Sequence, residues 1–566
     1  MDIKYSKDCV LLTFIFTFTL IFSSIVYAGP KPSSAAIASA HPLATKAGEK
    51  ILRQGGNAFD AAVAVTAALA VVEPSGSGLG GGGFYLLHEA DKDHDIFVDA
   101  REMAPQAAHR DMYLDGQGQP IKFSSINGPL AAGIPGIPAA LEHLAVKYGN
   151  LPISTSLAPA IEHAQNGFEV SKSYVKKLNW RKKPMLKYPA TAEIFLDNNE
   201  LPEPGWTLKQ EDLATTLRAI ATSGKSGFYE GKTAKLLVEG AKKHGGIWTL
   251  DDLKNYQIVE RQPIRSTYHG INIISAPPPS SGGIALATML NILERYDLAK
   301  ASPVEQIHLI TEAMRRAYRD RAVYLGDSDF VTVPTKQLID PGYAKKISTS
   351  IKLDQATSSQ DLPGVALEQT GEDTTHFSII DEQGNRVAAT LSINLPFGAA
   401  FAPKGTGVLL NDEMDDFSIK PGTPNSYGLV GAEANAIAPG KRPLSSMSPT
   451  FLETKDHVAI LGTPGGSRII TMVLHGILAF AQDKPVSQWV SQPRFHHQYL
   501  PDHIQFEPEA FTDNTQQALQ SLGHKLKVLN RRYGNMQAIS WKIRTNQVTA
   551  ASDPRGIGSV SIVDTH

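Results

Sequence analysis

A threonine at the start of an apolar strand is the residue in this chain best suited to nucleophilic chemistry. Thr374 follows a polar stretch, residues 358–373, and leads into an alternating apolar segment, His376–Ile380. If the bond before Thr374 is cut, this one residue carries a nucleophile, its hydroxyl, and a base, its free α-amine. The alternative is an ordinary strand threonine, because Thr-Thr pairs are common in strands. The local sequence leaves both interpretations open.

A predicted hairpin brings further polar groups to Thr374. A turn at Gly384 separates the Thr374 strand from a second alternating segment, Arg386–Asn394. The ends of paired antiparallel strands are neighbours, so we expect Ser392 and Asn394 at the same sheet edge as Thr374. Hydroxyl and amide groups would then converge on the candidate nucleophile.

Two adjacent glycines, Gly465 and Gly466, lie between the end of a predicted strand and an apolar-faced helix. Backbone N–H groups at such a turn point outward at the positive end of the helix dipole, which is how an oxyanion hole is built. The alternative is an ordinary tight turn in which Ser467 is the helix N-cap. The turn alone does not decide between them.

A longer glycine-rich stretch, residues 75–83, contains the pattern G-x-G-x-x-G. A dinucleotide-binding loop of this pattern follows a strand and opens a helix. Here the predicted order is reversed, with a helix before the loop and a strand after it. We therefore interpret it as a loop that passes close to other chain segments or to a ligand, where side chains would not fit.

Arg101 follows a predicted strand, Asp95–Asp99, and stands between Asp99 and Glu102. One interpretation is a structural ion pair with these acids. The other is recognition of a substrate carboxylate by a bidentate guanidinium.

Composition bounds the remaining possibilities. The chain has 566 residues, 42% hydrophobic and 19% charged, with a net charge of −2. This is an ordinary globular composition, and its charge indicates no nucleic-acid partner. The patterns H-E-x-x-H, C-x-x-C and G-x-S-x-G are absent and no histidines have metal-ligand spacing, so we expect no metal and no cofactor.

The first 28 residues have the features of a secretory signal peptide. Lys4 and Lys7 precede an apolar run, Val10–Ile25, and small residues follow, so we expect cleavage after Ala28. The alternative, an uncleaved anchor, is disfavoured because the run is shorter than the roughly 20 residues that span a membrane. The only cysteine, Cys9, lies inside this segment. We expect export to the periplasm or beyond, with no membrane segment in the mature protein.

Apolar periodicity predicts several helices and one connector. The polar segment Lys352–Asp373 shows no clear period and is interpreted as a mobile connector that ends at Thr374. The helices are predicted over Pro42–Gln54, Ala58–Val72, Pro138–Lys147, Asp212–Ala221, Ile284–Tyr296 and Val304–Leu325.

An ordered set of motifs, spread over residues 35–560, resembles the γ-glutamyltranspeptidases, a family of N-terminal nucleophile hydrolases. Each motif alone is weak evidence for the family, but their occurrence together in this order is specific for it. The motifs are Gly55–Ala62, the glycine-rich loop, Arg101–Pro105, Pro279–Gly283, Thr374–His376, Met414–Phe417, Lys441–Pro449, Gly465–Arg468, Pro493–His497 and Ala551–Arg555.

The resemblance implies a precursor that cuts itself between Asp373 and Thr374. A large chain, residues 29–373, and a small chain, 374–566, would stay together in one four-layer αββα sandwich, an α+β fold with two antiparallel sheets between helices. Thr374 would attack the γ-carbonyl of a γ-glutamyl compound such as glutathione. The resulting ester would pass to water, an amino acid or a small peptide.

The resemblance also assigns the site. Gly465 and Gly466 would form the oxyanion hole, and Ser392, threonine in some relatives, would keep a hydroxyl near Thr374. The lid tyrosine of bacterial members corresponds to Tyr427. The substrate's α-carboxylate would be bound by Arg101, Ser445 and Ser446. Its α-ammonium would be bound by Asn394, Glu413 and Asp416.

Two rival hypotheses remain. One is an acylase of the same architecture that removes glutaryl-type side chains from β-lactams, which would not need Glu413 and Asp416. The other is an uncleaved, non-catalytic secreted binding protein, for which Thr374 and the complete pocket set have no evident purpose.

Overall fold

The computed structural model describes residues 30–362, 374–420, 423, 426 and 431–564. Lys31–His566 form one compact unit. The predicted signal peptide, the scissile residue Asp373 and the predicted lid residue Tyr427 lie outside the described residues. Within those residues, no helix is both long enough and apolar enough to cross a membrane.

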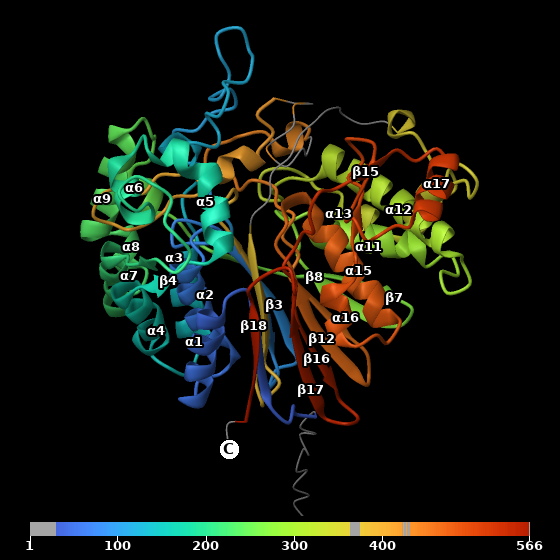
Figure 1. The fold of residues 1–566 in the computed structure, drawn as a ribbon, viewed down its shortest axis with the longest axis horizontal. Coiled ribbons are helices and arrows are strands. Elements are labelled where there is room, and N and C mark those ends of the chain that lie inside the picture. Colours follow the sequence, from blue (N-terminus) through green and yellow to red (C-terminus); the bar gives the residue numbers. More distant parts are fainter. Residues whose placement is uncertain (1–29, 363–373, 421–422, 424–425, 427–430, 565–566) are drawn as a thin grey trace, which may run out of the picture. The chain divides into compact units, whose positions relative to one another are not determined.

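Two antiparallel sheets lie at the centre of this unit (Figure 1). The seven-stranded sheet has the order β18-β1-β9-β10-β2-β3-β6 and the six-stranded sheet the order β17-β16-β12-β11-β8-β7. Strands of the first are β1 Ala35–Ser39, β2 Gly82–Glu89, β3 His94–Ala100, β6 Val259–Arg261, β9 Thr375–Ile380, β10 Arg386–Ser392 and β18 Ser559–Val563. Strands of the second are β7 Ile264–Tyr268, β8 Ile271–Ser275, β11 Thr450–Glu453, β12 His457–Gly462, β16 Gln537–Lys542 and β17 Gln547–Ser552.

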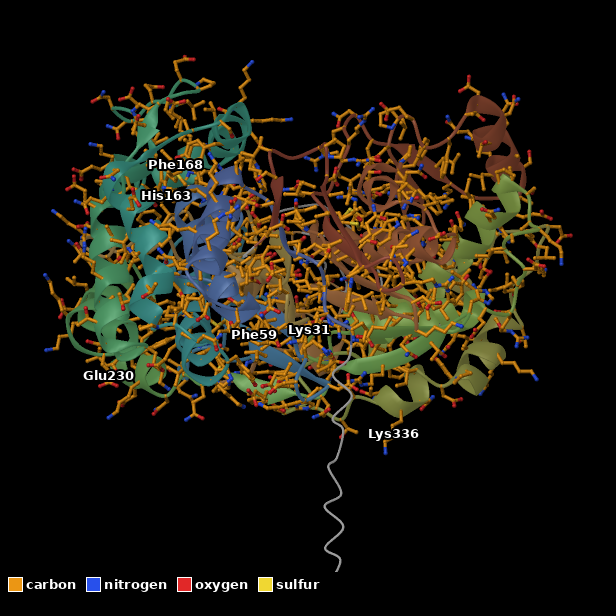
Figure 2. All side chains as sticks on the ribbon, turned by 90° about the horizontal axis from the view of Figure 1, so that it is seen from below. Lys31, Phe59, His163, Phe168, Glu230 and Lys336 are labelled. Atoms are coloured by element: carbon orange, nitrogen blue, oxygen red, sulfur yellow. The ribbon has the colours of Figure 1, made fainter. Side chains whose placement is uncertain are left out.

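Helices cover the outer face of each sheet (Figure 1). On the side of the seven-stranded sheet lie α1 Pro42–Arg53, α2 Ala58–Val72, α3 Ile137–Lys147, α4 Ile153–Asn166, α5 Lys172–Met185, α6 Pro189–Phe195, α7 Glu211–Ser223, α8 Ser226–Tyr229, α9 Gly231–Lys243 and α10 Leu250–Lys254. On the other side lie α11 Gly282–Leu293, α12 Pro303–Tyr324, α13 Thr335–Leu338, α14 Pro341–Ser348, α15 Ile469–Ala481, α16 Val486–Ser491 and α17 Asp513–Ser521. Side chains at the periphery, such as those of Glu230 and Lys336, point outward (Figure 2).

Small accessory elements complete the described chain. They are two small sheets, β4 Phe168–Glu169 with β5 Thr207–Leu208 and β13 Phe495–His496 with β14 Ile504–Phe506 and β15 Leu526–Val528, and the 3-10 turns η1 Pro129–Ala131, η2 Ser359–Asp361, η3 Glu413–Asp416, η4 Glu433–Asn435 and η5 Gly466–Arg468.

Strand β9 shows why the sheets are buried on both faces. Phe377 and Ile379 pack with the first helix layer, whereas Ile380 belongs to the core on the other face, between the two sheets. Side chains alternate between the two faces of a strand, so a strand that lies between two cores must be apolar throughout. The predicted αββα sandwich is confirmed, and strands from both sides of Thr374 share each of its sheets.

The second helix, α2, positions the glycine-rich loop. Every residue of Ala58–Val72 is buried, as its all-round apolar sequence predicts. Its first turn carries a capping box, in which the Asn57 side chain accepts N–H groups and the Asp60 carboxylate accepts the N–H of Asn57. The helix ends at Glu73, and the loop then runs directly under the start of β9.

The described part of the predicted connector, residues 352–362, is hydrogen-bonded to the surrounding protein at Thr357 and Ser359. The N–H of Ser359 donates to Asp502 over 2.9 Å, and the N–H of Thr357 donates to Glu312 over 3.1 Å. Arg315 donates to the hydroxyl of Ser359 over 2.6 Å. Polar groups of this segment therefore bind charged side chains of the far helix layer and its neighbouring loop. The remainder, residues 363–373, lies outside the described residues.

Candidate active site

Thr374 lies at the start of β9, 5% exposed. Its Oγ1 is 3.5 Å from the Oγ of Ser392, on the neighbouring strand β10. The hairpin prediction is therefore confirmed in its geometry: Leu391 is the partner of Thr375 in the β9–β10 register, which brings the next residue, Ser392, beside Thr374. Two hydroxyl groups thus meet at one end of the sheet.

The chain turns sharply after β10. Asn394 has a φ of 71°, in the left-handed region, and its N–H donates to the Oγ of Ser392 over 2.8 Å. Its side-chain amide donates to the carbonyl of Asp412 over 2.9 Å. This turn keeps Asn394 beside Thr374, and both residues line the same cavity.

The glycine-rich loop packs against this hairpin, as its composition predicts. A Cβ atom on Gly81 would lie 2.1 Å from the carbonyl oxygen of Ser392. A Cβ on Gly76 would lie 3.4 Å from the carbonyl oxygen of Thr374. The side chain is excluded at Gly81 by backbone, which cannot move aside cheaply, so this glycine is required by close approach.

Gly465 and Gly466 form the predicted turn between β12 and the helical segment that begins with η5. Their φ angles are 140° and 55°, both in the region that favours glycine. In the described part of the chain, no acceptor takes the N–H of either residue. Ser467 does not cap the helix; its hydroxyl donates to Gln498 over 2.7 Å. The turn therefore offers two N–H donors, Gly466 at the smaller of two cavities that Thr374 lines and Gly465 at the larger.

Arg101 is 1% exposed and is held by acids. Its Nη1 is 2.8 Å from Glu413 and 3.5 Å from Glu102, and its Nη2 is 2.5 Å from Asp416. Its Nε donates to the carbonyl of Pro443 over 3.2 Å. The ion-pair interpretation therefore describes this arginine, with Glu413 and Asp416 as its main partners in addition to the neighbouring Glu102.

Burial governs the charges around Arg101. It raises the pKa of Glu102 to about 7, although the charge of Arg101 acts in the opposite direction. It also raises the pKa of Glu413 well above its usual range, again against the attraction of Arg101. Burial raises the pKa of a carboxyl group because it disfavours the charged form, and a nearby cation lowers it. Arg101 therefore offsets part of the effect of burial on both acids.

The two predicted serines face the same cavity with their hydroxyl oxygens already engaged. The Oγ of Ser445 accepts the N–H of Met447 over 3.1 Å, and the Oγ of Ser446 accepts Nη2 of Arg321 over 3.3 Å. A hydroxyl that accepts in this way retains its own proton for donation. Ser445 and Ser446 can therefore donate two hydrogen bonds to an anion in the cavity.

The smaller cavity is nearly filled. It has a volume of about 20 Å³, room for roughly one water molecule. Its lining brings together eight residues that the sequence assigned to the site: Thr374, Ser392, Asn394, Asp416, Arg101, Ser445, Ser446 and Gly466. Glu413 contacts Arg101 but does not line the cavity. Arg101 and Asp416, which both line this cavity, are in direct contact with each other.

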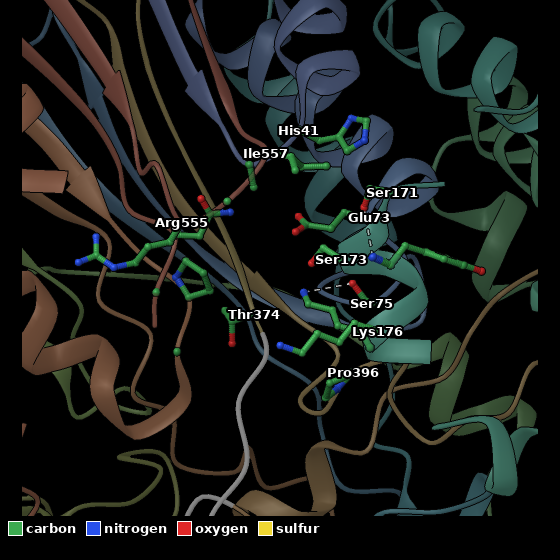
Figure 3. A pocket seen from close by; sticks show the side chains of 18 of the residues that line it. His41, Glu73, Ser75, Ser171, Ser173, Lys176, Thr374, Pro396, Arg555 and Ile557 are labelled. Carbon is green, nitrogen blue, oxygen red and sulfur yellow. Dashed lines mark hydrogen bonds between the residues drawn. The ribbon is translucent and has the colours of Figure 1, made fainter. Parts of the chain in front are cut away.

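Thr374 also lines a larger cavity, of about 520 Å³ (Figure 3). Its wall includes Gly465, and the close-up shows Glu73, Lys176 and Arg555 around it. Thr374 thus lines two cavities, one closely fitted and one spacious.

Sequence reasoning missed Glu73 and Arg321. The Glu73 carboxylate accepts the hydroxyl of Thr375 over 2.6 Å and so fixes the residue after Thr374. Arg321 lines the smaller cavity from the far helix layer. Glu73 follows a helix that is otherwise entirely apolar, which was a usable signal; Arg321 is one of four arginines in α12 and had none.

The fold defines this protein as a hydrolase of the N-terminal nucleophile type. The family model for gamma-glutamyltranspeptidase matches residues 44–563, and the chain belongs to that family.

Curated relatives agree with this family. The glutathione hydrolase proenzyme of Pseudomonas sp. (strain A14) is 45% identical over 496 residues, 86% of each chain. That of Escherichia coli (strain K12) is 41% identical over 532 residues, covering 93% of this chain and 91% of the relative. An acylase ACY 1 proenzyme of Pseudomonas sp. (strain V22) is 36% identical over 514 residues, 88% of each chain.

Solved structures share the fold. A cephalosporin acylase from Bacillus halodurans has a TM-score of 0.82 at 27% identity, covering 94% of this chain and 96% of that one. A γ-glutamyltranspeptidase from Helicobacter pylori has a TM-score of 0.56 at 43% identity and covers 58% of this chain and 94% of the matched chain.

Proposed function

We propose that this γ-glutamyltranspeptidase is a glutathione hydrolase and transferase that processes itself at Thr374. The observation that carries the proposal is that Thr374 lines both a closely fitted charged cavity and a spacious one. Curated relatives named glutathione hydrolase proenzymes support the substrate and the precursor state.

Processing begins with attack of the Thr374 hydroxyl on the carbonyl carbon of residue 373. The C–N bond breaks as the acyl group moves to Oγ1, and water hydrolyses the resulting ester. This frees the α-amine of Thr374 and produces two chains, residues 29–373 and 374–566. The Helicobacter pylori match supports the division, because nearly all of one solved chain there corresponds to only 58% of this one.

Turnover uses the same hydroxyl. The α-amine of Thr374 accepts its proton as Oγ1 attacks the γ-carbonyl carbon of the donor. The N–H groups of Gly465 and Gly466 stabilise the oxyanion that forms. The proton then passes to the leaving nitrogen, the C–N bond breaks, and a γ-glutamyl ester remains on Thr374. Water or an acceptor amine attacks this ester and restores the enzyme.

The two cavities divide the substrate between them. The smaller cavity, which has room for only about one water molecule as it stands, widens to admit the glutamyl head group. Ser445, Ser446 and Arg101 then meet its α-carboxylate, and Asn394 and Asp416, with Glu413 behind them, meet its α-ammonium. The larger cavity receives the leaving group and then the acceptor, an amino acid or small peptide. We further propose that the protein is exported to the periplasm or beyond.

A chromogenic γ-glutamyl anilide tests the proposal. We expect release of the amine from this donor, and a faster release when a dipeptide acceptor is added if transfer competes with hydrolysis. A glutaryl anilide, which lacks the α-ammonium, should be a much poorer donor, because Asp416 then has no cation to bind. Preference for the glutaryl donor would favour the acylase function instead.

A further inference from the structure

Arg321 is a buried cation at the smaller cavity. It lies in the last turn of α12, is 5% exposed, and lines the cavity together with Thr374 and Arg101. Arginine is rarely this deeply buried unless it is paired with an acid. The groups that contact Arg321 therefore show whether another part of the protein balances its positive charge.

The partners of Arg321 are neutral. Its Nε donates to the Oγ of Ser281 over 3.0 Å and its Nη2 donates to the Oγ of Ser446 over 3.3 Å. Among the described residues, no carboxylate lies within ion-pair distance of its guanidinium, and no acceptor takes the N–H groups of Nη1. Arg101, in the same cavity, has two carboxylates within 2.8 Å.

Burial without an acid has an electrostatic cost. It lowers the pKa of Arg321 to about 10; Tyr318 and the charge of Asp416 act in the opposite direction, whereas the charge of Arg101 lowers the pKa further. The C-terminal end of α12 offsets part of this cost, because the negative end of the helix dipole favours a cation. An anion bound in the cavity would compensate the rest of this cost, because Arg321 lines the cavity.

The hydrogen bond from Arg321 to Ser446 also prepares a second donor for an anion in the cavity. Because Arg321 donates to Ser446, the hydroxyl of Ser446 must donate elsewhere, and it lines the cavity. Ser281 accepts from Arg321 and donates to the carbonyl of Ser445 over 2.8 Å, so it ties the guanidinium to the backbone of the same serine pair. Arg321 therefore acts on both serines at once.

We propose that Arg321 is a specificity-determining positioning residue for the donor's α-carboxylate. It supplies a positive charge that forms no ion pair with a carboxylate of the described chain, and it holds the Ser446 hydroxyl as a donor to the substrate's α-carboxylate. The inference rests on the proposed γ-glutamyl specificity of this site. It adds a second cation to the site without replacing Arg101.

Two acyl-donor substrates, one with and one without an α-carboxylate, test this role of Arg321. The first is a γ-glutamyl anilide, and the second is the 4-aminobutyryl anilide, which has the same chain and amine but lacks the α-carboxylate. In R321Q we expect KM for the first donor to rise about 10- to 100-fold, the range for a lost hydrogen bond to a charged group, with kcat changed less than threefold. Turnover of the second donor, low in the wild type, should be almost unaltered. R321K, which keeps the charge without the planar fork, should recover part of the loss.

The controls separate failure of this inference from failure of the proposed function. Arg319→Gln removes a neighbouring arginine of the same helix, which pairs with Asp320 and does not line the cavity, and should leave both KM values unchanged. Two fragments on a denaturing gel show that a variant has folded and processed itself. An inactive wild type would contradict the function itself.

Equal losses on both donors in R321Q, or an unchanged KM for the γ-glutamyl donor, would overturn the role of Arg321. If R321Q does not fold, the same comparison is made with R321K: a KM increase confined to the donor with the carboxylate supports the role, and an equal effect on both donors overturns it.

Discussion

Thr374 and Ser392 place two hydroxyl groups 3.5 Å apart at the end of one hairpin. The separation is long for a hydrogen bond between hydroxyls, but contacts of this kind tighten when substrate is bound. A second hydrogen bond orients the Ser392 side chain, because its Oγ accepts the N–H of Asn394 over 2.8 Å. Its hydroxyl proton is therefore available to Thr374.

We expect Ser392→Ala to lower kcat about 10- to 100-fold with little change in KM, since the lost hydroxyl acts on the nucleophile and not on the glutamyl group. Steady-state rates with the γ-glutamyl anilide measure this. Ser392→Thr keeps the hydroxyl and should retain most of the activity. A Ser392→Ala enzyme with normal kcat would show that the hydroxyl has no catalytic part.

Asp416 offers a second test at the residue scale. In Asp416→Asn we expect KM for the γ-glutamyl donor to rise about 10- to 100-fold, because the α-ammonium loses a carboxylate partner. The glutaryl donor has no ammonium and should be affected much less. Glu433→Gln changes an exposed carboxylate that pairs with Arg110 and serves as the matched control. Equal losses on the two donors would contradict the assignment of Asp416.

Local reasoning on the sequence found part of this site. The approach of Ser392 to Thr374 follows from a hairpin with a short turn, so strand alternation predicts it. The contact of Arg101 with Asp416 joins residues 315 positions apart, and no periodic pattern encodes it. The family resemblance placed both residues in one site but did not predict their contact. Neither approach found Arg321, because helix periodicity does not tell which arginine of α12 lines a cavity.

At the scale of elements, the segment before the cleavage site is attached to the far helix layer. Asp502 connects Arg315 of α12, His497 and the N–H of Ser359. Burial alone would raise the pKa of Asp502, but His497 and Arg315 hold it well below its usual range. The sequence could not reveal this, because Asp502 and Ser359 are 143 positions apart.

Asp502→Asn should therefore lower the free energy of unfolding by about 3 kcal/mol, the cost of breaking a largely buried ion pair. Since the folded-state pKa is depressed, the contribution of Asp502 is fully present above its unfolded pKa of about 3.9 and is lost as the pH falls through the folded value. The loss in the free energy of unfolding caused by Asp502→Asn should therefore be the same at pH 5 and pH 8. Denaturant unfolding at both values measures it.

A surface pair provides the control. Asp297→Asn removes an exposed partner of Lys300 and should leave the unfolding midpoint unchanged. If Asp502→Asn is no more destabilising than Asp297→Asn, the attachment of residues 352–362 contributes nothing to stability.

At the scale of the whole molecule, the two proposed chains share both sheets. In the seven-stranded sheet, β9 and β10 from the small chain lie between β1 and β2 from the large one, and β18 pairs with β1 at the edge. In the six-stranded sheet, β11 pairs with β8. Cleavage before Thr374 leaves every one of these ladders intact.

We expect the processed fragments to co-elute in size-exclusion chromatography under native conditions and to separate only in denaturant. Residues 374–566 produced alone should not fold cooperatively, because β9 would lose its β1 partner and the core shared with α2. A folded, soluble fragment 374–566 would contradict the interleaved sandwich.

The central claim is that Thr374 is both the cleavage point and the nucleophile. N-terminal sequencing of the smaller fragment of the wild-type protein, with Thr374→Ala run beside it, tests this most directly. The account predicts a fragment that begins Thr-Thr-His-Phe in the wild type, and a single uncut, inactive chain in the variant. A different first residue, or γ-glutamyl turnover by Thr374→Ala, would contradict it.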